Sequence, residues 1–547
     1  MIHMRKTIQK KHNQKKHTSV YKNALQLIAV GSVTGVFAGA IVTFFNILAN
    51  KAEEIAYDGY AFLRSNPAFI PLLFLVLALG AFFIGVAAEI SSVARGCGIP
   101  QAEGATRGAV RFRWFRDATA TFAACLVSIF MGLSVGAEGP SVLIGACMGD
   151  GVASSTHRNE MIKRYQITGG ACTGLAVASN APLTGIIFAF EEAHKRFTPE
   201  VFVCAFSSVV FGVLTRSAIY QLFGMQIQKA FHSYVFNELP LYYYGYVILA
   251  GILCGGLGVL FHKLCFTMRS AFKKIKTKNP KIRHGLRILI AVTLGGVFSL
   301  LTTGTLGGGH GLIEAMGTHG GESLSKIESV LQGLGISVIW TLLFVLLLKG
   351  IITTVNVGSG LPCGIFIPII AIGACVGGII TRFGVTLGLL NEKYCDILVM
   401  ICMAAFFTTI VRAPLTAVIM ICEFTGSFAS LLPVIIAVSI GYTIGEMSKT
   451  EGIYEELLEA YERENGIHEN AVREVYTLSV SHGALADKRE VRDVLWPTGT
   501  RVKEIHRGEE VILPDGDTVL HHGDILTIVC KTDNPQKTKD DLVHILE

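Results

Sequence analysis

Apolar stretches long enough to span a bilayer recur along most of this 547-residue chain. Five of them are residues 24–49, 71–89, 242–261, 285–301 and 333–355. A helix needs about 20 apolar residues to cross the hydrocarbon core of a membrane. Because the backbone in lipid must satisfy its own hydrogen bonds, such stretches fold as helices. The sequence therefore predicts an all-α polytopic membrane protein.

Charged side chains are concentrated at the C-terminal end. Residues 461–547 carry 17 acids and 11 bases, whereas the preceding 460 residues hold the other 60 charges. Soluble domains average roughly 25% charged residues, so only this end has a soluble composition. We divide the chain into a basic N-terminal segment (1–22), a transmembrane part (23–464) and a small C-terminal α/β domain (465–547).

The N-terminal segment carries seven Lys or Arg and no acid. It contains no apolar run, so a cleavable signal peptide is not expected. Basic residues ahead of a first span favour the cytoplasmic side. We therefore predict a cytoplasmic N-terminus, and we expect no nucleic-acid partner, because such basic runs usually set topology.

Thirteen cysteines are present, twelve of them in the apolar part. None forms a CxxC motif or a Cys/His cluster. Free cysteine behaves as a small apolar packing residue, and this is the interpretation we prefer. No metal and no cofactor are expected.

The chain contains an internal duplication. Residues 144–149 read IGACMG and residues 372–377 read IGACVG, an offset of 228. At the same offset Gly136 corresponds to Gly364. The motif APLT then occurs twice at an offset of 232, followed by GIIFAFE in the first copy and AVIMICE in the second. Repeated halves with short apolar segments broken by Gly and Pro are typical of transporter folds, whose substrate site lies between the halves.

Glycine- and proline-rich turns precede several of the apolar runs, among them GAEGP (136–140) and GIFIP (364–368). A helix N-terminus presents unpaired N–H groups and the positive end of the helix dipole. Several such ends that converge inside a membrane would bind an anion. Nothing resembles the TVGYG carbonyl filter of a cation channel. The turns therefore favour an anion site.

Glu138 is an acid in the middle of GAEGP. Ionisable residues inside a membrane are costly and indicate function. An ionised carboxylate here would occupy the anion site, and a protonated one would leave it, which would couple the anion to a proton. The alternative is a structural acid paired with a nearby Arg or Lys.

These motifs resemble those of the CLC family of chloride channels and transporters. Family members carry GSGIP, GREGP and GxFxP, which read here GCGIP (96–100), GAEGP (136–140) and GIFIP (364–368). The resemblance covers about residues 20–460. It implies a CLC-like fold of inverted repeats with broken helices, and a homodimer in which each subunit has its own anion path.

The resemblance also implies roles in anion binding. Glu138 matches the gating glutamate, and the backbone amides of Ile365 and Phe366 match those that hold the central anion. Tyr454 matches a tyrosine whose hydroxyl coordinates the anion; the alternative is an anchor at the membrane interface. Cys97 stands where the family has a serine that donates to the anion, and a thiol is a weaker donor.

Proton transfer on the cytoplasmic side would involve Glu192. In NAPLTGIIFAFEEA this residue matches the internal proton glutamate of family antiporters, and Glu191 matches a supporting acid. Adjacent residues of a helix lie about 100° apart, so the two need not share a face. The alternative for Glu192 is an ordinary helix end beside three basic residues, His194, Lys195 and Arg196.

Other residues have weaker claims. Ala137 replaces the Arg of GREGP, which alters the setting of the gate. Glu103 and Glu423 are expected to support helix packing or a water path. His310, in GGGHG, is interpreted as part of a loop that joins two short helices, and enzymatic activity is not expected, because no nucleophile motif accompanies it.

The C-terminal domain shows strand-like runs at 472–480 and 523–530, with a turn at PDG (514–516). It resembles the C-terminal domain of TrkA-type potassium-transport regulators. That resemblance implies a cytoplasmic module that pairs with a copy and that in some proteins binds a small ligand or ion. The sequence is consistent with two roles for this domain: it adjusts transport, or it only stabilises the assembly.

We therefore expect an antiporter that exchanges chloride, or a similar anion, for protons in a bacterial plasma membrane, with both termini cytoplasmic. The alternatives are a passive voltage- or pH-gated chloride channel of the same fold, a fluoride/proton antiporter, and a membrane receptor without ion flux.

Overall fold

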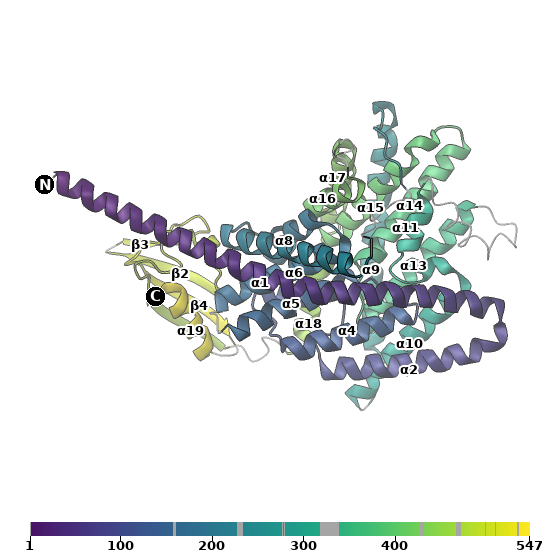
Figure 1. The fold of residues 1–547 in the computed structure, drawn as a ribbon, viewed down its shortest axis with the longest axis horizontal. Helices are drawn as coiled ribbons and strands as arrows, with labels where there is room; N and C mark the ends of the chain where they lie inside the picture. The colour runs from purple at the N-terminus through teal and green to yellow at the C-terminus, as the bar shows by residue number, and fades with distance from the viewer. Residues whose placement is uncertain are drawn as a thin grey trace.

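A computed structural model describes residues 2–547, except 157–159, 227–233, 276, 278, 318–337, 427, 429–430, 467–471, 498, 509 and 533–534. It has a long helical part followed by a small mixed domain (Figure 1). Helices α1 to α8 are Ile2–Ser65, Ile70–Ile90, Ile99–Thr106, Trp114–Phe130, Glu138–Ser155, Glu160–Ser179, Pro182–Phe188 and Pro199–Leu222. Helices α9, α10, α11 and α13 to α18 are Tyr244–Lys273, Pro280–Leu301, His310–Met316, Val338–Ser359, Phe366–Thr386, Cys395–Val411, Pro414–Thr425, Leu431–Met447 and Ile453–Glu464.

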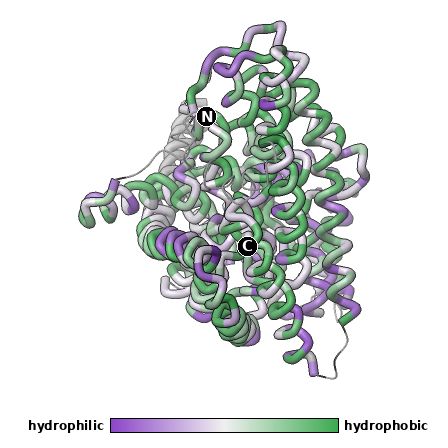
Figure 2. Tube along the Cα trace, turned by 90° about the vertical axis from the view of Figure 1, so that its right-hand side faces the viewer, coloured by the Kyte–Doolittle hydropathy of each residue, from purple (hydrophilic) through white to green (hydrophobic). Residues whose placement is uncertain are grey.

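Eight helices of the described residues are long and apolar enough to cross a membrane. They include the five predicted stretches, although 333–337 lies outside the described residues, and add α8, α14 and α15. Hydrophobic residues predominate along these helices (Figure 2). The apolar windows of α14 and α15 are 83% and 94% buried in protein, against 28% for the span that contains α2. Helices α14 and α15 therefore form the centre, and α2 faces the surroundings.

The duplication is visible as matching pairs of helices. Helix α5 begins at Glu138 and α14 begins at Phe366, an offset of 228. Each packs closely on the helix that follows it, α6 or α15. The APLT motifs open α7 and α16, which begin at Pro182 and Pro414 and contact one another. Proline is tolerated there because the first turn of a helix needs no N–H donor.

The C-terminal domain contains a four-stranded antiparallel sheet in the order β1-β4-β2-β3. Its elements are β1 Val472–Ser479, β2 Thr500–Arg507, β3 Glu510–Ile512, β4 Ile525–Thr532 and α19 Pro535–Leu546. Both predicted strand runs are confirmed as β1 and β4. The turn predicted at PDG is present, but the following Val519 pairs with Glu490 instead of extending a hairpin.

This domain docks on the end of the helical part where α1 begins (Figure 1). Arg489 forms an ion pair with Glu200 at the start of α8. Arg196 donates to the carbonyl of Arg492 at 2.7 Å, and Arg164 donates to the carbonyl of Trp496 at 3.3 Å. The domain therefore contacts the segment that follows Glu192.

Candidate functional site

Two loops, one from each repeat, meet inside the helical part. The N–H of Gly136 donates to the carbonyl of Gly364 at 2.8 Å, and the N–H of Gly364 donates back to Gly136 at 3.2 Å. Helices α5 and α14 begin two residues after these glycines. The reciprocal pairing of positions related by the duplication brings two helix N-termini to one place.

A third loop joins them. The N–H of Cys363 donates to the carbonyl of Gly96 at 3.1 Å, and α3 begins at Ile99. A methyl group on Gly139 would overlap the carbonyl oxygen of Cys97, so the close approach of these loops requires glycine. Converging helix N-termini are suited to an anion.

Glu138 is the first residue of α5, and its side chain is only 2% exposed. The carboxylate folds back over Gly136, where an added Cβ would lie 2.7 Å from Oε2. Within the described residues Oε2 has no hydrogen-bond partner, and Oε1 lies 3.6 Å from Nε2 of His310. Among the described residues, the predicted gate residue is thus a buried acid that has a histidine beside it and no Arg or Lys in ion-pair contact.

The predicted anion-binding residues are all buried. Ile365 precedes α14, Phe366 opens it, and the ring of Phe366 packs against Phe407 with centroids 4.9 Å apart. Amides in the first turn of a helix lack intrahelical acceptors. The Tyr454 hydroxyl, on α18, has no partner in the part of the chain that the structure describes. The charges of Glu192, Glu103 and Glu138 act on this buried hydroxyl.

Glu191 and Glu192 lie in a π-helical turn, Ala189–Ala193, which continues α7. Such turns are frequent at functional sites. The carboxylate of Glu191 accepts the N–H groups of Leu415 at 2.7 Å and Thr416 at 2.5 Å. Glu192 is 6% exposed, and neither of its carboxylate oxygens has a partner among the residues described. The two adjacent acids therefore differ: Glu191 caps α16, whereas Glu192 is a buried acid without a partner among the described residues.

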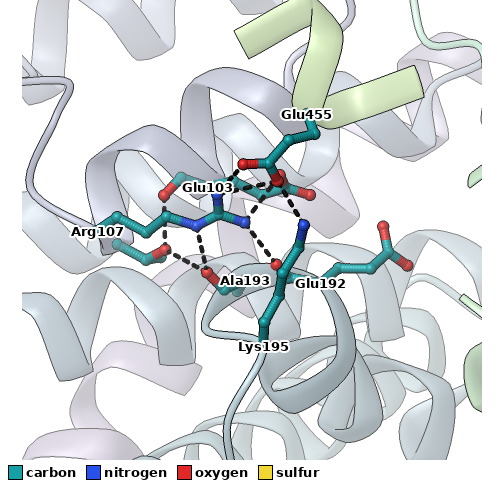
Figure 3. A network of polar contacts seen from close by, with 7 residues as sticks. Glu103, Arg107, Glu192, Ala193, Lys195 and Glu455 are labelled. Carbon is teal, nitrogen blue, oxygen red and sulfur yellow. Dashed lines mark hydrogen bonds and ion pairs between the residues drawn. The ribbon is translucent and has the colours of Figure 1, made fainter. Parts of the chain in front are cut away.

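Arg107 holds this turn in place (Figure 3). Its guanidinium donates to the carbonyls of Glu192 at 3.0 Å and Ala193 at 3.1 Å. It also contacts both oxygens of Glu455 at 2.8 and 3.0 Å, and lies 3.6 Å from Oε2 of the buried Glu103. Figure 3 shows the Glu192 side chain directed away from this network. Arg107 thus ties α3, the π-helical turn and α18 together.

A cavity of about 590 Å³ leads to Cys97. Six Lys or Arg side chains and two acids line it, namely Arg95, Arg269, Lys273, Lys281, Arg283, Arg287, Glu89 and Glu464. In the described part of the chain, Nε of Arg269 and of Arg287 is buried without a hydrogen-bond partner. The bases outnumber the acids, and a cleft with an excess of one sign of charge concentrates the opposite ion, so this approach to Cys97 favours anions.

Sequence reasoning missed several of these residues. Lys349 lies fully buried in α13 and donates to the carbonyls of Thr305, Leu306 and Gly307 at 3.4, 3.3 and 2.9 Å. The rule that singled out Glu138, an ionisable group in an apolar run, also applies to Lys349. Arg107 stands four residues after Glu103, the spacing of a helical ion pair. The thirteen cysteines are free, and all but Cys395 are buried.

Comparison with known proteins agrees with this arrangement. A sequence model described as voltage gated chloride channel matches residues 79–446, and a TrkA-C domain model matches 475–542. The H(+)/Cl(-) exchange transporter ClcA of Vibrio cholerae serotype O1 (strain M66-2) is 30% identical over 456 residues, which cover 80% of this chain and 90% of that protein. A protein with the same description from Cronobacter sakazakii is 28% identical over 426 residues, which cover 76% of this chain and 85% of that protein.

Two solved structures share the fold. A slow cyanobacterial Cl-/H+ antiporter superposes with a TM-score of 0.68 at 24% identity, covering 80% of this chain and 99% of its own. A CLC-type fluoride/proton antiporter gives a TM-score of 0.58 at 21% identity, covering 79% and 97%. With its paired repeats, broken helices and eight candidate spans, the chain belongs to the voltage gated chloride channel family and is a multi-pass membrane protein with a C-terminal TrkA-C domain.

Proposed function

We propose that this protein exchanges chloride, or a similar anion, for protons across the membrane, as a transporter and not an enzyme. Glu138 would act as the gate and outer proton acceptor, and Glu192 as the inner one. The observation that carries the proposal is a pair of buried acids, Glu138 and Glu192, each with a carboxylate oxygen that has no partner among the described residues.

The anion would bind among the loops at the starts of α3, α5 and α14. The amides of Ile365 and Phe366 and the hydroxyl of Tyr454 would donate to it, with a weaker contribution from the Cys97 thiol. In the ionised state the Glu138 carboxylate competes for the same donors. Protonation removes its charge, the anion replaces it, and movement of the anion is thereby linked to movement of a proton.

Proton pumping in liposomes tests the proposal. Purified protein is reconstituted, a chloride gradient is imposed, and the pH on both sides is followed without any initial proton gradient. Exchange predicts that protons move uphill as chloride runs down its gradient. Chloride flux without uphill proton movement would make the protein a passive channel of the same fold. Absence of any ion flux would favour a receptor.

Fluoride is the second candidate anion. Cys97 departs from the serine of the chloride motif, and the CLC-type fluoride/proton antiporter shares the fold. The ClcA relatives are described as chloride exchangers, and this favours chloride. Comparing fluoride and chloride efflux from the same liposomes decides between them.

The assembly and its orientation form part of the proposal. We place a homodimer in a bacterial plasma membrane with both termini in the cytoplasm. The start of α1 and the C-terminal domain lie at the same end of the helical part (Figure 1), which supports a common side for the termini. Labelling of single cysteines introduced near each terminus in intact and opened cells tests the orientation, and crosslinking tests the dimer.

The C-terminal domain would adjust transport through the segment that follows Glu192. Arg196 in that segment donates to the Arg492 carbonyl of the domain, and Lys195 pairs with Glu455 at 2.7 Å. A cavity of about 620 Å³ is lined by both parts of the chain, including Arg164, Lys531 and Asp541, where a small ligand or ion would act on both. Candidate ligands added to the full-length protein should change the rate of transport, and this change should be lost in R196A.

A further inference from the structure

His310 lies between the gate carboxylate and the surface. It is the first residue of α11, and its side chain is half exposed, whereas Glu138 is 2% exposed. Nε2 of His310 lies 3.6 Å from Oε1 of Glu138. Helix α11 lies on the side of the helical part away from the C-terminal domain (Figure 1). The imidazole therefore connects the buried acid with the solution on that outer side.

The loop before His310 is held firmly. Gly309 adopts a left-handed conformation, with φ of 108°, which turns the chain into α11. Lys349 donates to the carbonyls of residues 305–307, and a methyl group on Gly307 would overlap Oε1 of Glu53. The loop is thus fixed between α13 and α1, and the imidazole is presented to Glu138 by a preset backbone.

Titratable side chains surround the imidazole on several of the described helices. They are Glu53 and Tyr57 on α1, Glu138 on α5, Lys349 on α13, Cys375 on α14 beside Lys349, and Glu314 on α11 itself. Burial of the ring and the charge of Lys349 oppose its protonated form, whereas the two acids, Glu138 and Glu53, favour it. Histidine is the side chain whose unperturbed titration falls nearest neutral pH, so the site is built to hold an exchangeable proton.

We propose that His310 is the outer proton relay of the exchange cycle, passing protons between external water and Glu138. The inference rests on the proposed exchange of an anion for protons. In the inward step the Nε2–H bond of the imidazolium breaks and an O–H bond forms on Oε1 of Glu138. The neutral ring then takes a proton from external hydronium. The reverse sequence releases a proton when Glu138 ionises.

The test compares H310A with wild type in uniformly oriented vesicles, with pH varied on the outer face alone. Chloride-driven proton transport in H310A should fall at least about tenfold near neutral pH, since positioned acid–base groups contribute at least this much. The wild-type dependence on outer pH near neutrality should disappear. Imidazole added to the outer solution should restore transport in H310A, because the half-exposed position leaves room for it.

H522Q, which removes an exposed histidine of the C-terminal domain, is the matched control and should keep the wild-type rate and pH profile with or without imidazole. If H310A keeps the wild-type profile, the relay is wrong while the exchange stands. Equal slowing at every outer pH without imidazole rescue would show a role in positioning only and would also overturn the relay. If wild type pumps no protons, the proposed function fails, and the relay with it.

Discussion

Glu191 caps helix α16, which contains Glu423, and Glu423 in turn caps helix α7, which leads into the turn that contains Glu191. Glu191 follows α7 and accepts N–H groups at the start of α16, while Glu423, in α16, accepts the N–H groups of Leu183 and Thr184 at the start of α7, each at 2.7 Å. The two acids correspond at the offset of 232. Carboxylates at helix N-termini form strong charge-assisted hydrogen bonds, so the two halves are joined by a symmetric pair of caps.

The caps predict a larger cost for E423Q than for E191Q, because Glu423 also accepts the Thr184 hydroxyl at 2.6 Å. Each replaces a carboxylate that accepts two amides by a neutral group, and should lower stability by about 1–2 kcal/mol. Thermal unfolding in detergent measures the effect as decreases in midpoint, with the larger decrease in E423Q. E54Q, at an exposed acid of α1 paired with Lys51, is the control without change. Equal decreases in the two variants would show that the Thr184 hydroxyl adds nothing to the cap of α7.

E192Q should separate proton movement from anion movement. The side chain keeps its shape, and no described partner is lost, so stability should stay near wild type. Proton transport should fall roughly a hundredfold or more, because Gln does not carry a proton, while some chloride flux persists. E191Q, at the neighbouring acid, is the matched control. It should lower stability but keep proton transport coupled to chloride transport. Unchanged coupling in E192Q would remove this acid from the mechanism.

R107K should loosen the turn that presents Glu192. Lysine keeps the charge but lacks the planar fork that reaches both oxygens of Glu455 and two carbonyls at once. We expect a loss of about 1–3 kcal/mol in stability, together with slower proton transport at unchanged anion selectivity. R463K changes an exposed arginine of α18 and serves as the control. If R107K transports protons normally, the position of the turn does not depend on this network.

Acid should loosen the sheet of the C-terminal domain through Asp524. Burial opposes ionisation of this carboxyl, but hydrogen bonds from Arg507, both 2.8 Å, and from the His521 amide outweigh it and hold its pKa below the ordinary value. A depressed pKa contributes stability above the unfolded pKa of about 3.9, which is lost as pH falls through the folded value.

D524N should therefore raise amide exchange in β4 about thirtyfold at pH 7, corresponding to a loss of about 2 kcal/mol. The difference from wild type should shrink on acidification below about pH 4. D517N, at an exposed acid of the same domain, should exchange as wild type does. The measurement uses the full-length protein. Equal exchange in D524N and wild type at pH 7 would contradict the role of the pair.

The parts predicted best from the sequence depend on local pattern or on the repeat. Apolar length predicted five of the eight candidate spans among the described residues, and the offset of 228 related Gly136 to Gly364 before any contact was known. Because adjacent helical residues point about 100° apart, the sequence allowed Glu191 and Glu192 to have different surroundings. The structure shows that their surroundings do differ. The TrkA-C strands followed from runs of β-forming residues.

The contacts that the sequence did not predict join residues far apart in the chain. His310 was interpreted as a loop residue, but it is the first residue of α11. Its contact with Glu138 depends on how α1, α13 and α14 pack around the loop that precedes it. Arg107 binds carbonyls 85 and 86 residues away, and a carbonyl acceptor has no sequence signature. Side-chain to backbone contacts of this kind follow only from the packed fold.

The bridge between Gly136 and Gly364 has a consequence for how the protein is made. The two loops are synthesised 228 residues apart, and loop-closure entropy opposes their pairing until the second half is present. A nascent chain that ends before α14 holds only one side of the ion path. The route across the membrane therefore comes into existence late, when both halves are inserted, and an unfinished copy offers ions no complete way through.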